Sequence, residues 1–282
     1  MNWLVLTIVL PLFIVPTNRQ ERELEELFIK ENHFTYNGYT VTRSFAPWRE
    51  NPFGDSRITI KRGSTRLAQI KGCCFRDSVR FTLLPLFGDG RKQLIVEAYS
   101  GGGHCCTSYY IYEIGPRFRV LFNGAAYSPD DVGYSMKLMD LNNDGRFEFV
   151  QSVMNFDYFY ASHAKSVFPE VVFAFDHRYG KYRPANSSFS AYLLRDIATK
   201  RQAAEKLNAD LNPAQASSDV WRRQEYHYRF LDITLTYIFA GREAEGWSFF
   251  EQNYKLPNKR ELRADVKSML KVSAVYRSLR KP

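Results

Sequence analysis

The sequence predicts an α+β protein in which an antiparallel β-meander module, either propeller-blade-like or a sandwich, precedes a small helical domain. Short runs rich in Tyr, Phe and β-branched residues recur between Phe34 and Pro184, and these residue types favour strands. Gly, Asn, Asp and Pro separate the runs, and regular short strands with such turns indicate antiparallel meanders. From Ser190 onward the apolar residues recur at helical spacing.

The chain begins with an apolar segment from Trp3 to Pro16 that contains no charged residue. The segment is shorter than the roughly 20 residues of a membrane span, but it fits the core of a signal peptide. No Lys or Arg precedes it, and no A-x-A cleavage site follows it. We expect residues 1–17 to be a signal peptide or an uncleaved N-terminal anchor, so that the protein is exported as a periplasmic, secreted or anchored protein. A buried N-terminal strand or helix is the alternative.

Residues 18–33 show a different pattern. Leu24, Leu27 and Phe28 recur at helical spacing among Glu and Arg residues. We therefore expect an amphipathic helix that leads into the β-rich module.

The β-rich module is expected to span residues 34–188. Its turns include Gly88-Asp89-Gly90, Gly115-Pro116 and Asn143-Asp144-Gly145. The expected strands are Phe34–Arg43, Arg57–Ile60, Leu67–Ile70, Val79–Pro85, Gln93–Ala98, Ser108–Glu113, Arg117–Phe122, Tyr134–Met139, Phe147–Val153, Val171–Asp176 and Lys181–Arg183.

A weak internal repeat supports the meander. The turn at Gly88–Arg91 precedes the apolar run Gln93–Val96, and some 55 residues later the turn at Asn143–Arg146 precedes the run Phe147–Val150. A repeat of that length is about one four-stranded propeller blade. Two copies are fewer than a closed propeller needs, so the module is expected to be open or degenerate.

Residues 189–282 are expected to form a helical domain of antiparallel hairpins. The expected helices are Tyr192–Leu207, Asp219–Ala240, Glu243–Asn253 and one that begins at Asn258. Gly241 is a suitable C-cap for the second helix, and Asn258 with Glu261 forms a capping-box pattern. In the second helix, three-to-four spacing predicts a core stripe of Trp221, Tyr226, Phe230, Ile233 and Tyr237.

The chain has a formal net charge of +9, and most of the excess lies in this helical part. Residues 190–282 contain 17 Lys and Arg against 11 Asp and Glu. The charge forms either a solvated helical surface or a patch for acidic partners. We expect a protein or an acidic polymer as partner of the basic helical domain rather than nucleic acid, and a membrane only through the N-terminal segment.

The clearest chemical motif is Asp140-x-Asn142-x-Asp144-Gly145-x-x-Glu148. Ca²⁺ takes six to eight oxygen ligands, and oxygen side chains at alternate positions point inward when a loop curls around an ion. The expected ligands of a structural Ca²⁺ are Asp140, Asn142, Asp144, the carbonyl of Arg146, and Glu148. An EF-hand would need Glu at the position of Gln151 and a helix afterwards, so we expect a turn between two strands. A metal-free turn rich in Asn and Asp is the alternative.

Four cysteines occur as two adjacent pairs, Cys73-Cys74 and Cys105-Cys106. An even count in an exported chain suggests disulfides, and four cysteines allow three pairings between which the sequence cannot choose. If the two segments lie side by side, one bridge could form on each face, because neighbouring residues on a strand point to opposite faces. A Zn²⁺ site that includes His104 and free thiols are the alternatives, although adjacent cysteines fit zinc poorly.

The stretch from Ser100 to Thr107, with its Ser-Gly-Gly-Gly-His-Cys-Cys motif, resembles a motif in uncharacterised exported bacterial proteins related to FG-GAP/VCBS repeats, the blades of integrin-like propellers. Asp140–Val150 is similar to the Ca²⁺ loop of those repeats. The resemblance covers roughly Phe81 to Pro184 and implies fold and export more than activity. The poor loop around Asp89 and the small number of repeats depart from a full propeller.

Signals for catalysis are few: there is no G-x-S-x-G, and the five histidines are scattered. Asp157, His163 and Glu170 lie near an aromatic run and could share a cleft. We therefore expect an exported non-catalytic binding or envelope-associated structural protein. The alternatives are a hydrolase of an acidic or carbohydrate polymer that uses Asp157, His163 or Glu170, and a helical protein–protein adaptor.

Overall fold

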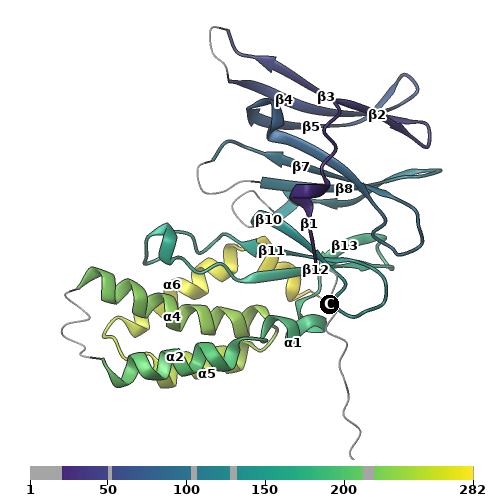
Figure 1. Ribbon diagram of the computed structural model, residues 1–282. Coiled ribbons are helices and arrows are strands. Elements are labelled where there is room, and N and C mark those ends of the chain that lie inside the picture. The colour runs from purple at the N-terminus through teal and green to yellow at the C-terminus, as the bar shows by residue number, and fades with distance from the viewer. Residues whose placement is uncertain (1–20, 50–52, 103–106, 128–131, 212–218, 282) are drawn as a thin grey trace, which may run out of the picture.

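The computed structural model describes residues 21–49, 53–102, 107–127, 132–211 and 219–281 (Figure 1). These residues form three antiparallel sheets followed by helices, which confirms the α+β prediction. The first two sheets are ordered β2-β3-β4-β5 and β6-β7-β8-β9, and the third is ordered β1-β10-β11-β12-β13. The strands are β1 (Glu21–Glu23), β2 (His33–Tyr36), β3 (Tyr39–Pro47), β4 (Gly54–Arg62), β5 (Thr65–Cys74), β6 (Val79–Leu84), β7 (Gln93–Tyr99), β8 (Thr107–Ile114), β9 (Phe118–Asn123), β10 (Val132–Met139), β11 (Glu148–Val153), β12 (Glu170–Asp176) and β13 (Lys181–Pro184).

Each sheet contains an up-and-down meander of four consecutive strands, the number found in a propeller blade. Figure 1 shows the three sheets one above another, with the helices beside the third. The turn between the first two strands of each meander contains a left-handed glycine: Gly38, Gly88 and Gly145 have φ of 76°, 68° and 79°. The repeat found in the sequence therefore has a third member, at Asn37-Gly38.

That third member divides a segment that the sequence analysis expected to be one strand, Phe34–Arg43. Asn37 and Gly38 both have positive φ, and Tyr36 is the partner of Tyr39 in a tight hairpin. Two successive positive φ values are the requirement of a type I′ turn, and Asn-Gly meets it at low cost. The segment is consequently two strands, β2 and the beginning of β3.

The amphipathic helix expected at residues 18–33 is wrong for the part that the structure describes. Glu21–Glu23 pairs with Lys137–Met139 as strand β1, and Leu24–Leu27 forms a single 3-10 turn. The edge of β10 offers backbone hydrogen bonds that outweigh the helix preference of this segment, which consists of Glu, Arg and Leu. Leu24 is buried, so one residue of the predicted apolar face does enter the core.

The helices are α1 (Ser190–Leu193), α2 (Ile197–Ala209), α4 (Val220–Phe239), α5 (Glu243–Asn253), α6 (Lys259–Val272) and α7 (Ala274–Leu279). Gly241 follows α4 with φ of 80°, as its predicted capping role requires. Four residues of the predicted α4 stripe are buried, but Trp221 is 73% exposed because it lies in the first turn, beyond the packed part of the helix. None of the helices within the described ranges has the length and apolar content needed to cross a membrane.

One apolar core runs from the second and third sheets into the helices. In the sheets it centres on Phe122, Phe149 and Phe173, with ring centroids 4.6–4.9 Å apart. A second core lies between the first two sheets and includes Ile58 and Val96. The helices therefore share their core with the third sheet.

Asn186 joins these two parts at the boundary expected after residue 188. Its side chain is buried, accepts a hydrogen bond from Val172 N at 2.8 Å, and donates to the carbonyl oxygens of Glu170 and Phe239 at 3.1 and 3.0 Å. Strand β12 and helix α4 are thus held by one amide group.

Candidate functional site

The turn between β10 and β11 contains the predicted Ca²⁺ motif. Asp140 accepts hydrogen bonds from the backbone N–H groups of Asp144 and Gly145, both at 3.0 Å. Asn142 Oδ1 accepts a second bond from Asp144 N at 3.2 Å. These bonds curl the chain into a tight turn, in which Asn142 and Asp144 are exposed and Asp140 is half-buried. The segment is not helical, and strand β11 rather than a helix follows it, which excludes an EF-hand.

Glu148 closes this turn from the first position of β11. Its carboxylate accepts a hydrogen bond from Leu141 N at 2.9 Å, and the residue is only 4% exposed. Burial raises the pKa of Glu148 to about 7, against the opposing effect of the Leu141 N–H, and the negative charges of Asp144 and Asp140 raise it further. The turn therefore concentrates negative charge around a buried carboxylate.

The donor set fits Ca²⁺ in its chemistry, because it combines carboxylates with an amide oxygen and the backbone carbonyl of Arg146. It does not fit zinc, which prefers Cys and His ligands. Among the described residues, no group of three or more His, Cys, Asp or Glu side chains lies close enough together to hold a metal ion. Asp140, Asp144 and Glu148 therefore do not meet at one point in this structure. To coordinate an ion, they would have to move closer together, with the amide of Asn142 and the carbonyl of Arg146 as further ligands.

The turn around Asp89 lies directly against this one. Phe147 N donates to Leu86 O at 2.9 Å, and a Cβ at Gly88 would lie 2.4 Å from the carbonyl oxygen of Gly145. The Asp89 carboxylate is bonded to Arg91, whose Nε is 2.8 Å away, and this hydrogen bond lowers the pKa of Asp89. The Asp89 carboxylate therefore already pairs with an arginine, and this pair stabilises the turn.

The cysteine pairs are only partly described. Cys73 and Cys74 at the end of β5 form a disulfide with each other, whereas Cys105 and Cys106 lie outside the described residues. A Cβ at Gly101 would lie 2.9 Å from both sulfur atoms. The bond between Cys73 and Cys74 excludes a bridge from either of them to the second pair, so the suggested bridge on each face is wrong for these two cysteines. Gly101 lies directly against this disulfide.

The three residues of the hydrolase hypothesis do not converge. His163 Nδ1 lies 2.8 Å from Asp157 Oδ1, but Glu170 forms an ion pair with Arg195 at 2.8 Å. Tyr158 N also donates to Asp157, so this carboxylate stabilises the conformation of the loop that contains it. Asp157 and His163 form one structural pair, and Glu170 belongs to a different site.

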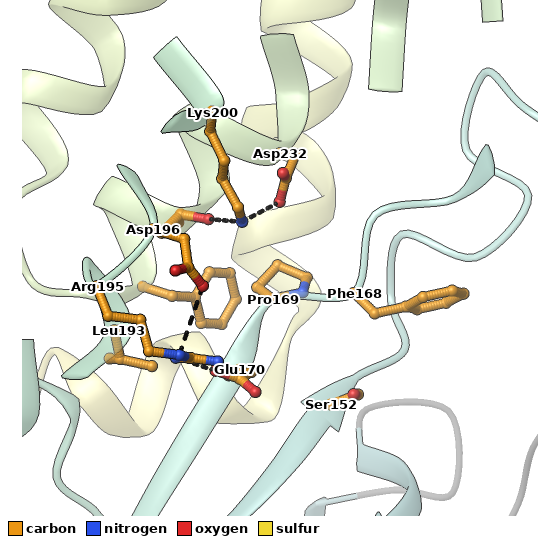
Figure 2. A pocket seen from close by; sticks show the side chains of 11 residues that line it. Ser152, Phe168, Pro169, Glu170, Leu193, Arg195, Asp196, Lys200 and Asp232 are labelled. Carbon is orange, nitrogen blue, oxygen red and sulfur yellow. Dashed lines mark hydrogen bonds and ion pairs between the residues drawn. The ribbon is translucent and has the colours of Figure 1, made fainter. Parts of the chain in front are cut away.

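That different site is a pocket of about 230 Å³ between β12 and the helices (Figure 2). Its charged side chains pair with one another. Arg195 binds Glu170 and lies 3.6 Å from Asp196, while Lys200 Nζ lies 2.9 Å from Asp232 Oδ1. Although burial opposes it, the hydrogen bond to Glu170 raises the pKa of Arg195. One pair connects β12 with the turn before α2, and the other connects α2 with α4, so both support the packing of these elements.

Sequence analysis missed this cluster, apart from Glu170, because its members come from three distant stretches of the chain: Glu170, Arg195 to Lys200, and Asp232. Comparison of the chain with protein-family models, with curated proteins and with solved structures finds no match. The assignment of a function consequently depends on the geometry of the molecule itself.

Proposed function

We propose that this protein is a non-catalytic binding or envelope-associated protein in which the Asp140–Glu148 turn holds a structural Ca²⁺. The observation that carries this proposal is Glu148, a buried carboxylate whose pKa is raised to about 7 beside two further carboxylates. Without a cation, burying an ionised carboxylate among like charges costs free energy. A bound Ca²⁺ would offset that cost.

The proposed ligands are Asp140, Asn142, Asp144, the carbonyl of Arg146, and Glu148. Asp140 directly follows β10 and Glu148 is the first residue of β11, so a shared ion would link the two strands. Because the turn packs on Leu86 and Gly88, ligation would also stabilise the contact between the second and third sheets. The role of the ion is therefore architectural.

The three four-stranded meanders support the proposed relation to propeller repeats. The disulfide between Cys73 and Cys74 supports the proposed export, because disulfides persist in oxidising compartments. Mass spectrometry of the protein recovered from cell fractions tests this proposal. A protein that is found in the cytoplasm with its thiols reduced would contradict it.

A thermal melt with Ca²⁺ or with chelator tests the metal proposal, since a ligand that binds only the folded state raises the melting temperature. We expect millimolar Ca²⁺ to raise Tm, and millimolar Mg²⁺ to raise it less. The variants Asp140→Asn and Asp144→Asn should lose the Ca²⁺ response. Asp89→Asn, in the neighbouring turn, is the matched control and should keep it.

The proposal fails if Ca²⁺ at millimolar concentration leaves Tm of the unmodified protein unchanged. It also fails if Asp89→Asn abolishes the response as completely as Asp140→Asn, because the effect would then not be specific to this turn.

A further inference from the structure

A groove of about 730 Å³ lies between the β12–β13 hairpin and the C-terminal end of α7. It is large enough for a small organic ligand. Basic and hydroxyl side chains make up most of its polar lining, and one carboxylate, that of Asp176, is included. The lining residues that the argument uses are Asp176, Arg178, Arg183, Ser187, Arg280 and Lys281.

Two of the four basic residues are neutralised by carboxylates. Arg178 forms an ion pair with Asp176 at 3.3 Å, and Arg280 forms one with Glu243 at 2.7 Å. No ion pair is formed by Arg183 or Lys281 within the described part of the chain. The charge of Arg183 is nevertheless close enough to Asp176 to help Arg178 lower the pKa of that carboxyl, against the opposing effect of burial. Four cations against the two carboxylates of Asp176 and Glu243 leave an excess of two positive charges. The groove therefore carries about two uncompensated positive charges, one from β13 and one from the segment after α7.

Tyr179 holds the guanidinium of Arg183 in place. The Arg183 Cζ lies 4.1 Å from the centroid of the Tyr179 ring, a cation–π contact. A guanidinium offers five N–H donors in a planar fork that matches phosphate and carboxylate oxygens. Because the guanidinium of Arg183 is already held in place, the side chain loses less conformational entropy when an anion binds.

Hydroxyl groups complete the polar lining. Ser187 and Ser188 are exposed at the start of the helical part, and both line the groove with the basic residues. Serine hydroxyls donate to anionic oxygens in the same way as backbone N–H groups do. The combination of an arginine fork, a lysine and hydroxyls is the chemistry that recognises phosphate.

We propose that this groove binds a small ligand that carries a phosphate monoester or diphosphate group. A phosphate monoester has a charge of about −1.5 to −2 at neutral pH, which matches the two uncompensated cations. This inference names a ligand class for the proposed binding role, but it does not depend on Ca²⁺, because Arg183 and Lys281 are not among the proposed metal ligands.

The test is calorimetric titration of the whole protein with pyrophosphate and with glucose 6-phosphate, at constant ionic strength and with EGTA present throughout. Glucose and sodium chloride are the neutral and simple-anion controls. We expect both phosphorylated probes to bind. Arg183→Gln and Lys281→Gln should each weaken binding roughly tenfold or more, as expected for the loss of a charge-assisted contact. Lys271→Gln, on exposed α6 surface, is the matched control and should bind like the unmodified protein.

Absence of binding at millimolar probe overturns the proposal, as does equal weakening by Lys271→Gln. Binding of a single-stranded oligonucleotide without binding of either small phosphate also overturns it, because a general basic surface for polyanions would explain that result. Since EGTA removes Ca²⁺ from every titration, failure of the metal proposal leaves the outcome for the groove unaffected.

Discussion

Replacement of Glu148 by Gln tests the electrostatic account of the β10–β11 turn. Burial, assisted by the neighbouring Asp144 and Asp140, raises the pKa of the folded-state carboxyl from its ordinary 4.5 to about 7. The folded state therefore holds the proton more tightly than the unfolded state does. The stability that this proton contributes is fully present below about pH 4.5, and it is lost as the pH rises through 7. The loss is roughly 3 kcal/mol once both states are ionised.

Glutamine carries no charge, yet its side-chain oxygen can still accept the hydrogen bond from Leu141 N. In chelator at pH 8 we expect Glu148→Gln to be more stable than the unmodified protein by up to about 3 kcal/mol. At pH 4.5 the two should differ little, because the carboxyl of the unmodified protein is then largely protonated. Urea denaturation followed by tryptophan fluorescence at both pH values measures the difference.

Asp89→Asn provides the control for this experiment. Hydrogen bonding to Arg91 lowers the pKa of Asp89, so its ionised form stabilises the fold. This variant should therefore show no gain in stability at pH 8. If Glu148→Gln is no more stable than the unmodified protein at pH 8, or gains equally at pH 4.5, ionisation of Glu148 is not the cause and the reasoning is refuted.

Two further substitutions test the packing. Asn186→Ala should reduce the free energy of unfolding by about 2–4 kcal/mol, because it removes the partner of two buried backbone groups and of a third that is partly buried. Urea denaturation measures the loss, and an unchanged midpoint would contradict the bridging role of this side chain. Gly88→Ala should cost about 2–4 kcal/mol, since a Cβ would meet a backbone carbonyl at 2.4 Å. Gly90→Ala has the same positive φ but open space, so it should cost only about 1 kcal/mol, and equal losses would exclude the steric explanation.

The sequence predicted the elements well where local chemistry decides them. The strand at Arg57–Ile60, the turn at Asn143-Asp144-Gly145 and the capping glycine after α4 were all expected from local signals. The turn and the glycine lie where they were expected, and the strand lies within the longer β4. It failed at residues 21–27, where pairing with β10, more than 100 residues away, decides the structure.

The candidate sites divide in the same way. The Asp140–Glu148 motif could be found because its members lie within nine residues and belong to one turn. Arg183 and Lys281 are nearly 100 residues apart, and only the packing of α7 beside β13 places them in one groove. No periodicity or spacing could have indicated that arrangement.

The separate core between the first two sheets has a consequence for the order of folding during synthesis. The core between the first two sheets draws on residues from Ile29 to Phe118, so it can assemble while the last 160 or so residues are still being made. The third sheet can be completed only after β10 has been synthesised and has paired with β1. Its core also needs the helices, which are synthesised last. We therefore expect a ribosome-bound chain to acquire protease resistance in two stages, with the early stage confined to the first two sheets.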